Sequence, residues 1–151
     1  MEKEYEFFIK ATPSEVWDAI TGREVRGRFQ FGAEITSDWL PDSRYEVTSP
    51  AASLLLIEGV NLEVDPPRRL VQSALMHFNE DVTAEGTSRV TWEIEPVGSD
   101  SSRLLVVHDE MREGANPLLY GGWPMILSGL KTWLETGEEL TTPGSLMYRK
   151  G

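Results

Sequence analysis

The sequence predicts an α+β fold in which a curved antiparallel sheet of six or seven strands wraps around one long C-terminal helix, with two short helices after the first strand. The length of 151 residues fits one domain, which we expect to span residues 1–151. Apolar residues alternate with polar ones in several segments up to Met111, which is typical of half-buried strands. Between Trp123 and Leu134 they recur instead at spacings of three and four, which indicates an amphipathic helix.

The first elements are a strand and a short helix. Alternation over Tyr5–Ala11 predicts a strand with its apolar residues on one face, namely Tyr5, Phe7 and Ile9. Thr12 then precedes Pro13, and Glu15 stands three residues after the threonine, which is the pattern of a capping box at a helix start. We expect this helix to end near Gly22.

The middle of the chain reads as short elements joined by turns. A second short helix is predicted over Glu24–Phe29, before Gly32 interrupts it. Strands are expected around Tyr45 and Val47 and over Leu54–Val64, Leu70–Phe78, Arg89–Pro96 and Arg103–Met111. Gly59 indicates a bulge in its strand, and turns are expected at Trp39–Arg44 and Gly98–Asp100. The sheet is therefore antiparallel and polar on its outer face.

Two details of these elements have alternative interpretations. The residues of one strand that face the helix are either Leu70, Met76 and Phe78 or Val71, Leu75 and His77. A shift of one residue exchanges the two faces of a strand, and the sequence does not decide between them. Pro124 stands either in the first turn of the terminal helix or at a kink of a helix that begins nearer Pro117, and we favour the kink. Gly137 is the expected C-cap.

The composition excludes several classes of function. The chain has no cysteine, which removes disulfides, thiolate nucleophiles and cysteine-based metal sites. The net charge of −11 disfavours binding to nucleic acid and to anionic membrane surfaces. The charged N-terminus lacks the apolar region of a signal peptide, and the longest apolar run, Leu54–Ile57, is too short to span a bilayer. We therefore expect a cytoplasmic protein that binds neither nucleic acid nor membranes.

Four segments of the chain are similar to one protein family. They are Ala11–Trp17, Thr36–Trp39, Glu63–Val71 with its pair of prolines, and the start of the terminal helix in Gly122–Leu134. Together they resemble the START-like or Bet-v-1-like (SRPBCC) superfamily, and within it the branch named for activators of the 90-kDa heat-shock protein ATPase. The resemblance implies a helix-grip fold and, for much of the superfamily, the binding of a hydrophobic molecule. These segments are scaffold residues, and a fold alone does not give a function.

Two features depart from this pattern. The segment Thr48–Ile57 is short, and Ser49–Ala52 within it differs from the usual strand, so we expect a loop that borders the entrance of a pocket. The eukaryotic co-chaperone has an additional N-terminal domain, which has no counterpart in these 151 residues. This difference weakens the expectation of a chaperone-activating role.

Few residues are available for chemistry. His108 continues the inward alternation of its strand, as a buried structural histidine or as a polar group in a pocket, and many members of the similar family have a histidine near this point. His77 is expected at the surface or at an edge. The neighbours His108, Asp109 and Glu110 point to alternate faces of a strand, so they do not form a metal site. No nucleophile or phosphate-loop motif occurs, and we expect no catalytic residue, metal or cofactor.

A pocket is expected between the sheet and the terminal helix. Its predicted ligand-binding residues are Phe29, Trp39, Trp92, His108, Met111, Tyr120, Trp123 and Leu127. Tyrosine and tryptophan combine an apolar body with a polar group, which suits a pocket as well as a core. The predicted function is binding of a small hydrophobic or amphipathic molecule. The alternatives are a protein-interaction module with a protein partner, and a cyclase or dehydratase that uses His108 with an acid such as Glu110, Asp38 or Glu58.

Overall fold

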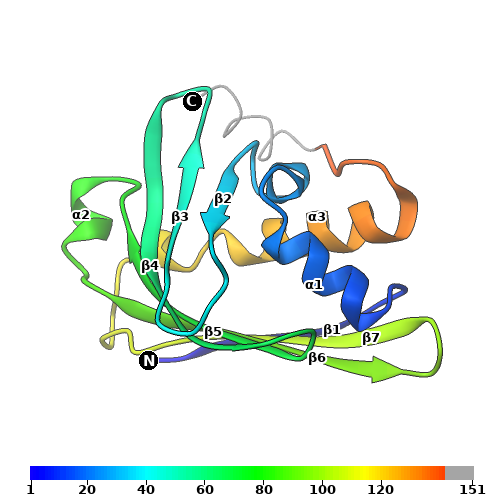
Figure 1. Cartoon of the computed structure of the whole chain (residues 1–151). Coiled ribbons are helices and arrows are strands. Elements are labelled where there is room, and N and C mark those ends of the chain that lie inside the picture. The colour runs from blue at the N-terminus through cyan, green and yellow to red at the C-terminus, as the bar shows by residue number, and fades with distance from the viewer. Residues whose placement is uncertain (142–151) are drawn as a thin grey trace.

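A seven-stranded antiparallel sheet curls around one long helix in the computed structural model, which describes residues 1–141 (Figure 1). The strands are β1 (Lys3–Ile9), β2 (Glu34–Ser37), β3 (Arg44–Ser49), β4 (Leu54–Asp65), β5 (Arg69–Met76), β6 (Ser88–Val97) and β7 (Ser101–Asp109). Their order in the sheet is β1-β7-β6-β5-β4-β3-β2, so the first and last strands of the chain are neighbours.

The helical elements lie on the concave side of this sheet, except α2 at its left-hand end (Figure 1). They are α1 (Pro13–Thr21), α2 (Glu80–Thr83), α3 (Trp123–Thr136) and two 3₁₀-helices, η1 (Val25–Arg28) and η2 (Pro117–Leu119). The α+β helix-grip fold predicted from the sequence is confirmed, with seven strands, one long helix, and α1 and η1 as the two short helices after the first strand.

The helix α1 begins with the expected capping box. The backbone N–H of Glu15 donates to the Thr12 hydroxyl over 3.3 Å, and the Glu15 carboxylate accepts from the Thr12 N–H over 3.0 Å. Pro13 occupies the first helical position. An N–H at this position would have no partner inside the helix, so proline loses no hydrogen bond there. The buried face of the helix, which includes Val16 and Ile20, then packs into the core.

The helix α3 begins at Trp123, so Pro124 lies in its first turn and the expected kink is wrong. The preceding 3₁₀-helix η2 is a separate element. A proline in the first turn has the backbone angle that a helix needs and no N–H to satisfy, so it starts the helix without bending it. At the other end Gly137 has a φ of 75° and donates its N–H to the Trp133 carbonyl over 2.9 Å, as the predicted C-cap requires.

The register of β5 decides one alternative that the sequence left open. Its residues on the concave face are Leu70, Gln72, Ala74 and Met76, all of them buried. The register that directs Leu70 and Met76 inward is therefore the observed one, and Phe78 lies beyond the end of the strand. This face also carries the polar Gln72, whose Nε2 donates to Asn61 Oδ1 over 3.0 Å. The buried amide of Gln72 is therefore a polar group on the concave face of the sheet, next to the interior space of the protein.

Gly59 of β4 lies at a close approach of two strands and not at a bulge. The pairing of β4 with β5 shifts between Asn61 and Glu63, which makes Leu62 the extra residue. The bulge expected at Gly59 is therefore wrong in its position. A Cβ atom at Gly59 would stand 2.0 Å from the carbonyl oxygen of Ser73, so only a glycine allows the strands to come this close.

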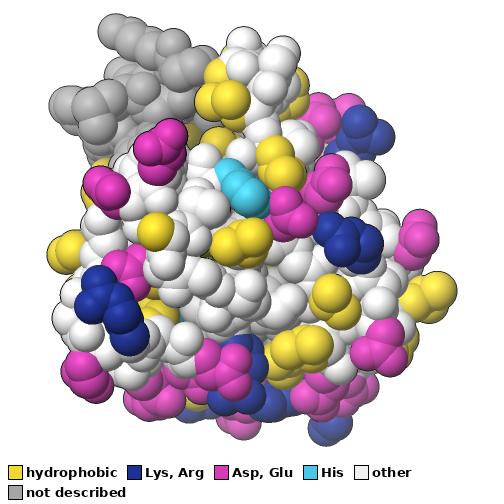
Figure 2. Space-filling model, turned by 90° about the vertical axis from the view of Figure 1, so that its left-hand side faces the viewer, with side chains coloured by type: hydrophobic (Ala, Val, Ile, Leu, Met, Phe, Trp, Pro, Cys, Tyr) yellow, Lys and Arg dark blue, Asp and Glu magenta, His cyan; other side chains and the backbone are white. Residues whose placement is uncertain are grey.

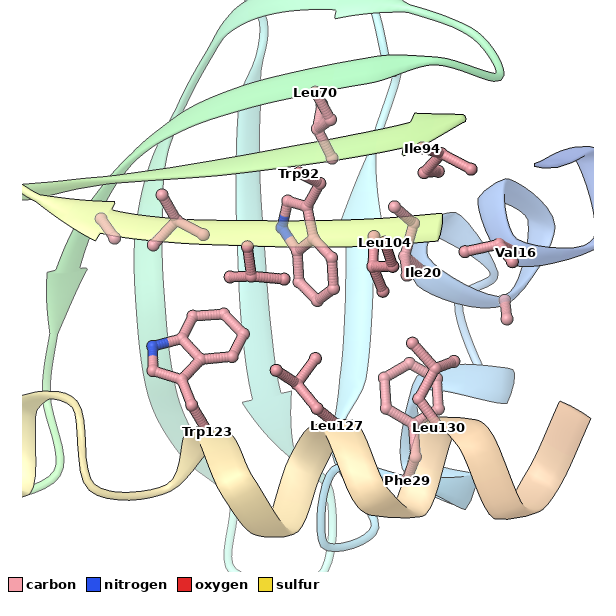
Figure 3. Close-up of a cluster of buried hydrophobic side chains, with 14 of the residues drawn as sticks. Val16, Ile20, Phe29, Leu70, Trp92, Ile94, Leu104, Trp123, Leu127 and Leu130 are labelled. Atoms are coloured by element: carbon pink, nitrogen blue, oxygen red, sulfur yellow. The ribbon is translucent and has the colours of Figure 1, made fainter. Parts of the chain in front are cut away.

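The core lies between the sheet and α3, with α1 closing one end. Figure 3 shows that Trp123, Leu127 and Leu130 point from α3 toward the strands, while Trp92 and Leu104 point from the sheet toward the helix. Both Leu104 and Leu130 are fully buried. The end of the molecule near α1 is thus filled by packed side chains, which confines any interior space to the other end.

Candidate functional site

A cavity of about 450 Å³ lies between the curled sheet and the helical layer. Residues of β3, β4, β5 and β6 line one side, and residues of η1, η2 and α3 line the other. The apolar part of the lining includes Val47, Leu56, Met76, Val90, Trp92 and Ile126. Small-molecule sites in proteins are apolar spaces of roughly 300–1,000 Å³, so this cavity has the size and the character of such a site.

The mouth of the cavity is marked by three lining residues that are largely exposed. Leu54 at the start of β4, Phe78 after β5 and Leu118 in η2 are 55%, 45% and 56% exposed. The segment Thr48–Ile57 contributes further lining residues, including Ser49 and Ala52. The opposite, buried end is formed by residues such as Trp92, which is 1% exposed. A ligand would therefore enter past apolar side chains and end among aromatic ones.

His77 lies on the surface, as the sequence predicts. Its side chain is 28% exposed, whereas His108 is fully buried. Figure 2 shows a histidine side chain (cyan) beside acidic ones (magenta) on the surface. His77 Nε2 lies 2.8 Å from Glu58 Oε2, and Glu58 also pairs with Arg44 over 3.0 Å. These groups compensate one another and do not line the cavity.

Arg26 places a positive charge at the buried end of the cavity. It is 4% exposed and is the one charged side chain of the lining among residues 1–141. Its Nη1 donates to Gln30 Oε1 over 3.0 Å, and its Nη2 donates to the carbonyl of Ile20. The guanidinium carbon lies 5.6 Å from the ring centroids of both Phe29 and Trp92, within reach of a cation–π contact.

The guanidinium of Arg26 stays protonated in this environment. Burial lowers its pKa to about 10, and the nearby Tyr45 acts against that shift. Burial also raises the pKa of the Tyr45 hydroxyl, which donates a 2.7 Å hydrogen bond to the carbonyl of Ser73. At neutral pH the cavity therefore contains a cation and an uncharged phenol.

His108 is fully buried and lies behind the wall of the cavity. Trp123 Nε1 donates to His108 Nδ1 over 3.0 Å, so Nδ1 carries no proton and Nε2 carries one. Nε2 then donates to the Ser88 hydroxyl over 2.8 Å, which leaves that hydroxyl to donate to the Ala74 carbonyl at 3.4 Å. This directed chain holds the Trp123 ring, which lines the cavity, while His108 does not line it.

Acid is expected to destabilise the folded protein through His108. Burial lowers the pKa of His108 to about 4, although the nearby charge of Asp109 acts to raise it. The ordinary pKa of histidine is about 6.5. Between these two values the unfolded chain binds a proton that the folded protein excludes, so stability falls as pH drops from 6.5 to 4. The loss should reach about 3 kcal/mol at the acid end and be absent above pH 6.5.

This prediction is tested by urea unfolding between pH 4 and pH 8 in the wild type and in His108→Gln. The carboxylates are common to both proteins, so the difference between the two pH profiles isolates the histidine. Parallel profiles below pH 6.5 would show that His108 does not titrate as its burial requires.

Comparison with known proteins assigns the family. Residues 10–135 match the family described as Activator of Hsp90 ATPase homolog 1-like protein. The chain belongs to this family. The match covers the capping box, every strand of the sheet except β1, and nearly all of α3. No curated protein sequence matches the chain.

Solved structures of three organisms have the same fold as this family member. CalU16 from Micromonospora echinospora is 21% identical, with a TM-score of 0.72 over 99% of this chain and 81% of its own. An HSP90 activator from Plasmodium falciparum is 19% identical, with a TM-score of 0.72 over 89% of this chain and 96% of its own. The Aha1 dimer from Colwellia psychrerythraea is 15% identical, with a TM-score of 0.71 over 91% and 98%. At these identities the likeness concerns the fold alone.

The structure of this family member brings three of the eight predicted ligand-binding residues into the cavity lining, namely Trp92, Tyr120 and Trp123. The other five lie outside the lining. Phe29, Met111 and Leu127 belong to the packed core, and His108 lies behind the cavity wall. Trp39 follows β2 in a left-handed conformation, with a φ of 56°, and packs against the core from the turn.

The helix α3 explains why some of these residues are packed and others line the cavity. Successive residues of a helix point about 100° apart, so Ile126 lines the cavity while Leu127 enters the core. Phe29 packs against Gly129, where an added Cβ atom would stand 3.3 Å from it. The backbone and the Cβ atom of Phe29 approach the helix through the space that the glycine leaves, and Phe29 belongs to the packed core and not to the lining.

Sequence reasoning missed the polar residues of the lining, which include Arg26, Gln30, Tyr45 and Gln72. Tyr45 and Val47 lie on the same face of β3, two residues apart, and both line the cavity. The alternation of β3 could therefore have predicted that Tyr45 faces the interior. Gln72 was not predicted in the lining because the sequence did not decide which face of β5 points inward. Arg26 lies in a helix of four residues, which is too short to show a buried face by periodicity.

Glu110 does not share the side of His108, contrary to the expected alternation. The strand β7 ends at Asp109, and Glu110 adopts a left-handed φ of 60°. Arg89 pairs with both carboxylates, at 2.7 Å with Asp109 and 3.4 Å with Glu110. Glu110, one of the acids that the cyclase or dehydratase hypothesis pairs with His108, therefore lies on the outer side, and no Asp or Glu of residues 1–141 lines the cavity.

The described residues also bear on membrane insertion and on metal binding. No helix in residues 1–141 has both the length and the hydropathy to cross a membrane. The same residues contain no group of three or more His, Asp or Glu side chains placed to hold a metal ion.

Proposed function

We propose that this protein binds a small hydrophobic or amphipathic molecule in the cavity between the sheet and α3. The observation that carries the proposal is the cavity itself, with its volume of about 450 Å³, its apolar walls and its few polar groups. The exposed Leu54, Phe78 and Leu118 at the mouth support it, because exposed apolar residues rimming a cavity are typical of an entrance for an apolar ligand.

A protein-interaction role is the second candidate, favoured by the family and by the fold shared with an HSP90 activator. An interaction surface is expected to be a large contiguous apolar patch. Among residues 1–141, the exposed large apolar residues are Phe8, Leu40, Leu54, Leu62, Phe78, Val97 and Leu118. Apart from Leu54 and Leu62, which share β4, they come from different parts of the fold, and three of them rim the cavity, so their arrangement supports ligand binding over a broad docking face.

A thermal-shift screen tests ligand binding, with fatty acids, aromatic polyketides, flavonoids and sterols as probes. A ligand at a hundred times its dissociation constant adds about 2.7 kcal/mol. For a chain of this size that should raise the melting temperature by roughly 5–10 °C.

Two tryptophan variants of β4 show whether a hit binds in the cavity. Leu56→Trp adds bulk to the lining, and we expect it to weaken binding by about tenfold or more. Leu62→Trp places the same side chain outside this lining, at a residue that is 48% exposed, and should leave the affinity unchanged. No shift with any probe class, or equal affinity in both variants, would count against the proposed site.

A further inference from the structure

Arg26 is a buried cation to which the described residues offer no carboxylate. Its neighbours along the chain differ, since Arg23 pairs with Glu34 at 3.4 Å and Arg28 pairs with Glu139 at 3.8 Å. Among the described residues, the nearby titratable group that opposes the lowering of the Arg26 pKa is the hydroxyl of Tyr45, which carries no negative charge at neutral pH. An arginine with so little exposed surface is ordinarily paired with an acid, because an unpaired buried charge costs several kcal/mol.

Hydrogen-bond donors remain available on Arg26. Its Nε has no hydrogen-bond partner among residues 1–141, while each terminal nitrogen donates one bond, to Gln30 and to the Ile20 carbonyl. Each terminal nitrogen carries a second N–H. The indole N–H of Trp92, another lining residue, also has no partner in this part of the chain. Two unpartnered buried donors therefore belong to residues at the same end of the cavity.

We propose that the ligand is an amphipathic monocarboxylate, with its carboxylate bound by Arg26 and its apolar body lying toward the mouth. This inference rests on the proposed function and deepens it. A carboxylate is planar and accepts hydrogen bonds from a guanidinium in a fork, which is a strong, charge-assisted arrangement. The ligand carboxylate would also supply the negative charge that the described residues do not offer to Arg26.

The charge of the lining selects a monoanion. Arg26 is the one cation among the lining residues described, so a phosphate monoester with nearly two negative charges would leave one of them unpaired in an apolar space. The protein as a whole has a net charge of −11, which disfavours anions at its surface. If the protein binds an anion more tightly than its neutral analogue, the preference must therefore come from a group inside the cavity and not from the surface charge.

The test compares carboxylates with neutral analogues of the same size by isothermal titration at pH 7.5. One pair is decanoate and decan-1-ol, and an aromatic pair is 2-naphthoate and 2-naphthalenemethanol. We expect the wild type to bind the carboxylate of at least one pair about tenfold more tightly than its alcohol, as one charge-assisted contact requires. This comparison needs no variant, so it stands even where a substitution at Arg26 prevents folding.

Matched variants then locate the source of the preference. Arg26→Gln should bring the carboxylate and alcohol affinities to within about threefold of each other, because the carboxylate loses its charge-assisted contact. Arg28→Gln removes the same charge two residues along η1, from a side chain that is 54% exposed and outside the lining, and should retain the preference. A melting curve of each variant verifies that it is folded.

The outcomes separate this inference from the proposed function. Equal binding of carboxylate and alcohol by the wild type would overturn the role of Arg26 and leave cavity binding in place. A preference that survives in Arg26→Gln would overturn it as well. No binding of either pair, together with a flat thermal-shift screen, would overturn both proposals.

Discussion

Gly59→Ala is expected to destabilise the folded protein by about 3 kcal/mol or more, because an alanine at this position collides with the neighbouring strand. Its Cβ would stand 2.0 Å from the carbonyl oxygen of Ser73, 2.7 Å from the carbonyl carbon and 2.9 Å from Tyr45 Cε1. Both strands are fixed here by hydrogen bonds, since the Val60 N–H donates to the Ser73 hydroxyl over 2.9 Å and the Tyr45 hydroxyl donates to the Ser73 carbonyl.

Gly122→Ala is the matched control for this prediction. Gly122 has ordinary helical angles, with φ −80° and ψ −15°, and an added Cβ would be 3.6 Å from Ile126 Cδ1, which is an ordinary contact. Its cost should stay below about 1 kcal/mol. Urea unfolding of both variants measures the difference, and similar free energies of unfolding would show that β4 and β5 can separate at Gly59 without loss.

The parts of the fold that the sequence predicted are those with a local cause. The box formed by Thr12 and Glu15 needs only four consecutive residues, and Gly137 ends α3 by its own backbone freedom. Strand alternation reports which face is buried, so six or seven antiparallel strands and one long helix were predicted from the period of the apolar residues. This reasoning did not decide the function: the family resemblance led to ligand binding as the first prediction, with protein interaction and catalysis as alternatives.

The parts that the sequence missed depend on contacts between distant segments. Nothing near Arg26 in the chain indicates burial, because the residues that cover it include Trp92, far along the sequence. Whether Leu127 or Ile126 lines the cavity depends on a rotation of α3 that only packing sets. The end of β7 at Asp109 moves Glu110 to the outer face, which alternation alone does not foresee.

Trp92→Ala is expected to destabilise the protein by about 3–5 kcal/mol, the usual cost of removing a large buried side chain. Trp92 is 1% exposed, and its ring meets the Trp123 ring edge-on with 5.4 Å between centroids. Its indole N–H has no hydrogen-bond partner among the described residues, so the loss comes from packing and not from a broken hydrogen bond. The substitution also removes the wall between the core and the cavity, so the interior space should grow.

Trp133→Ala is the control that shows how much stability is lost when a partly buried tryptophan is removed instead of the buried Trp92. Trp133 is only partly buried on α3 and has the Arg28 guanidinium carbon 5.2 Å from its ring centroid, a contact that contributes about 0.5–1 kcal/mol. Urea unfolding should therefore show a much smaller loss for Trp133→Ala than for Trp92→Ala. Equal losses would mean that the core collapses into the space left by Trp92. In that case the walls of the cavity would adapt to their contents, and its volume would not limit the size of the ligand.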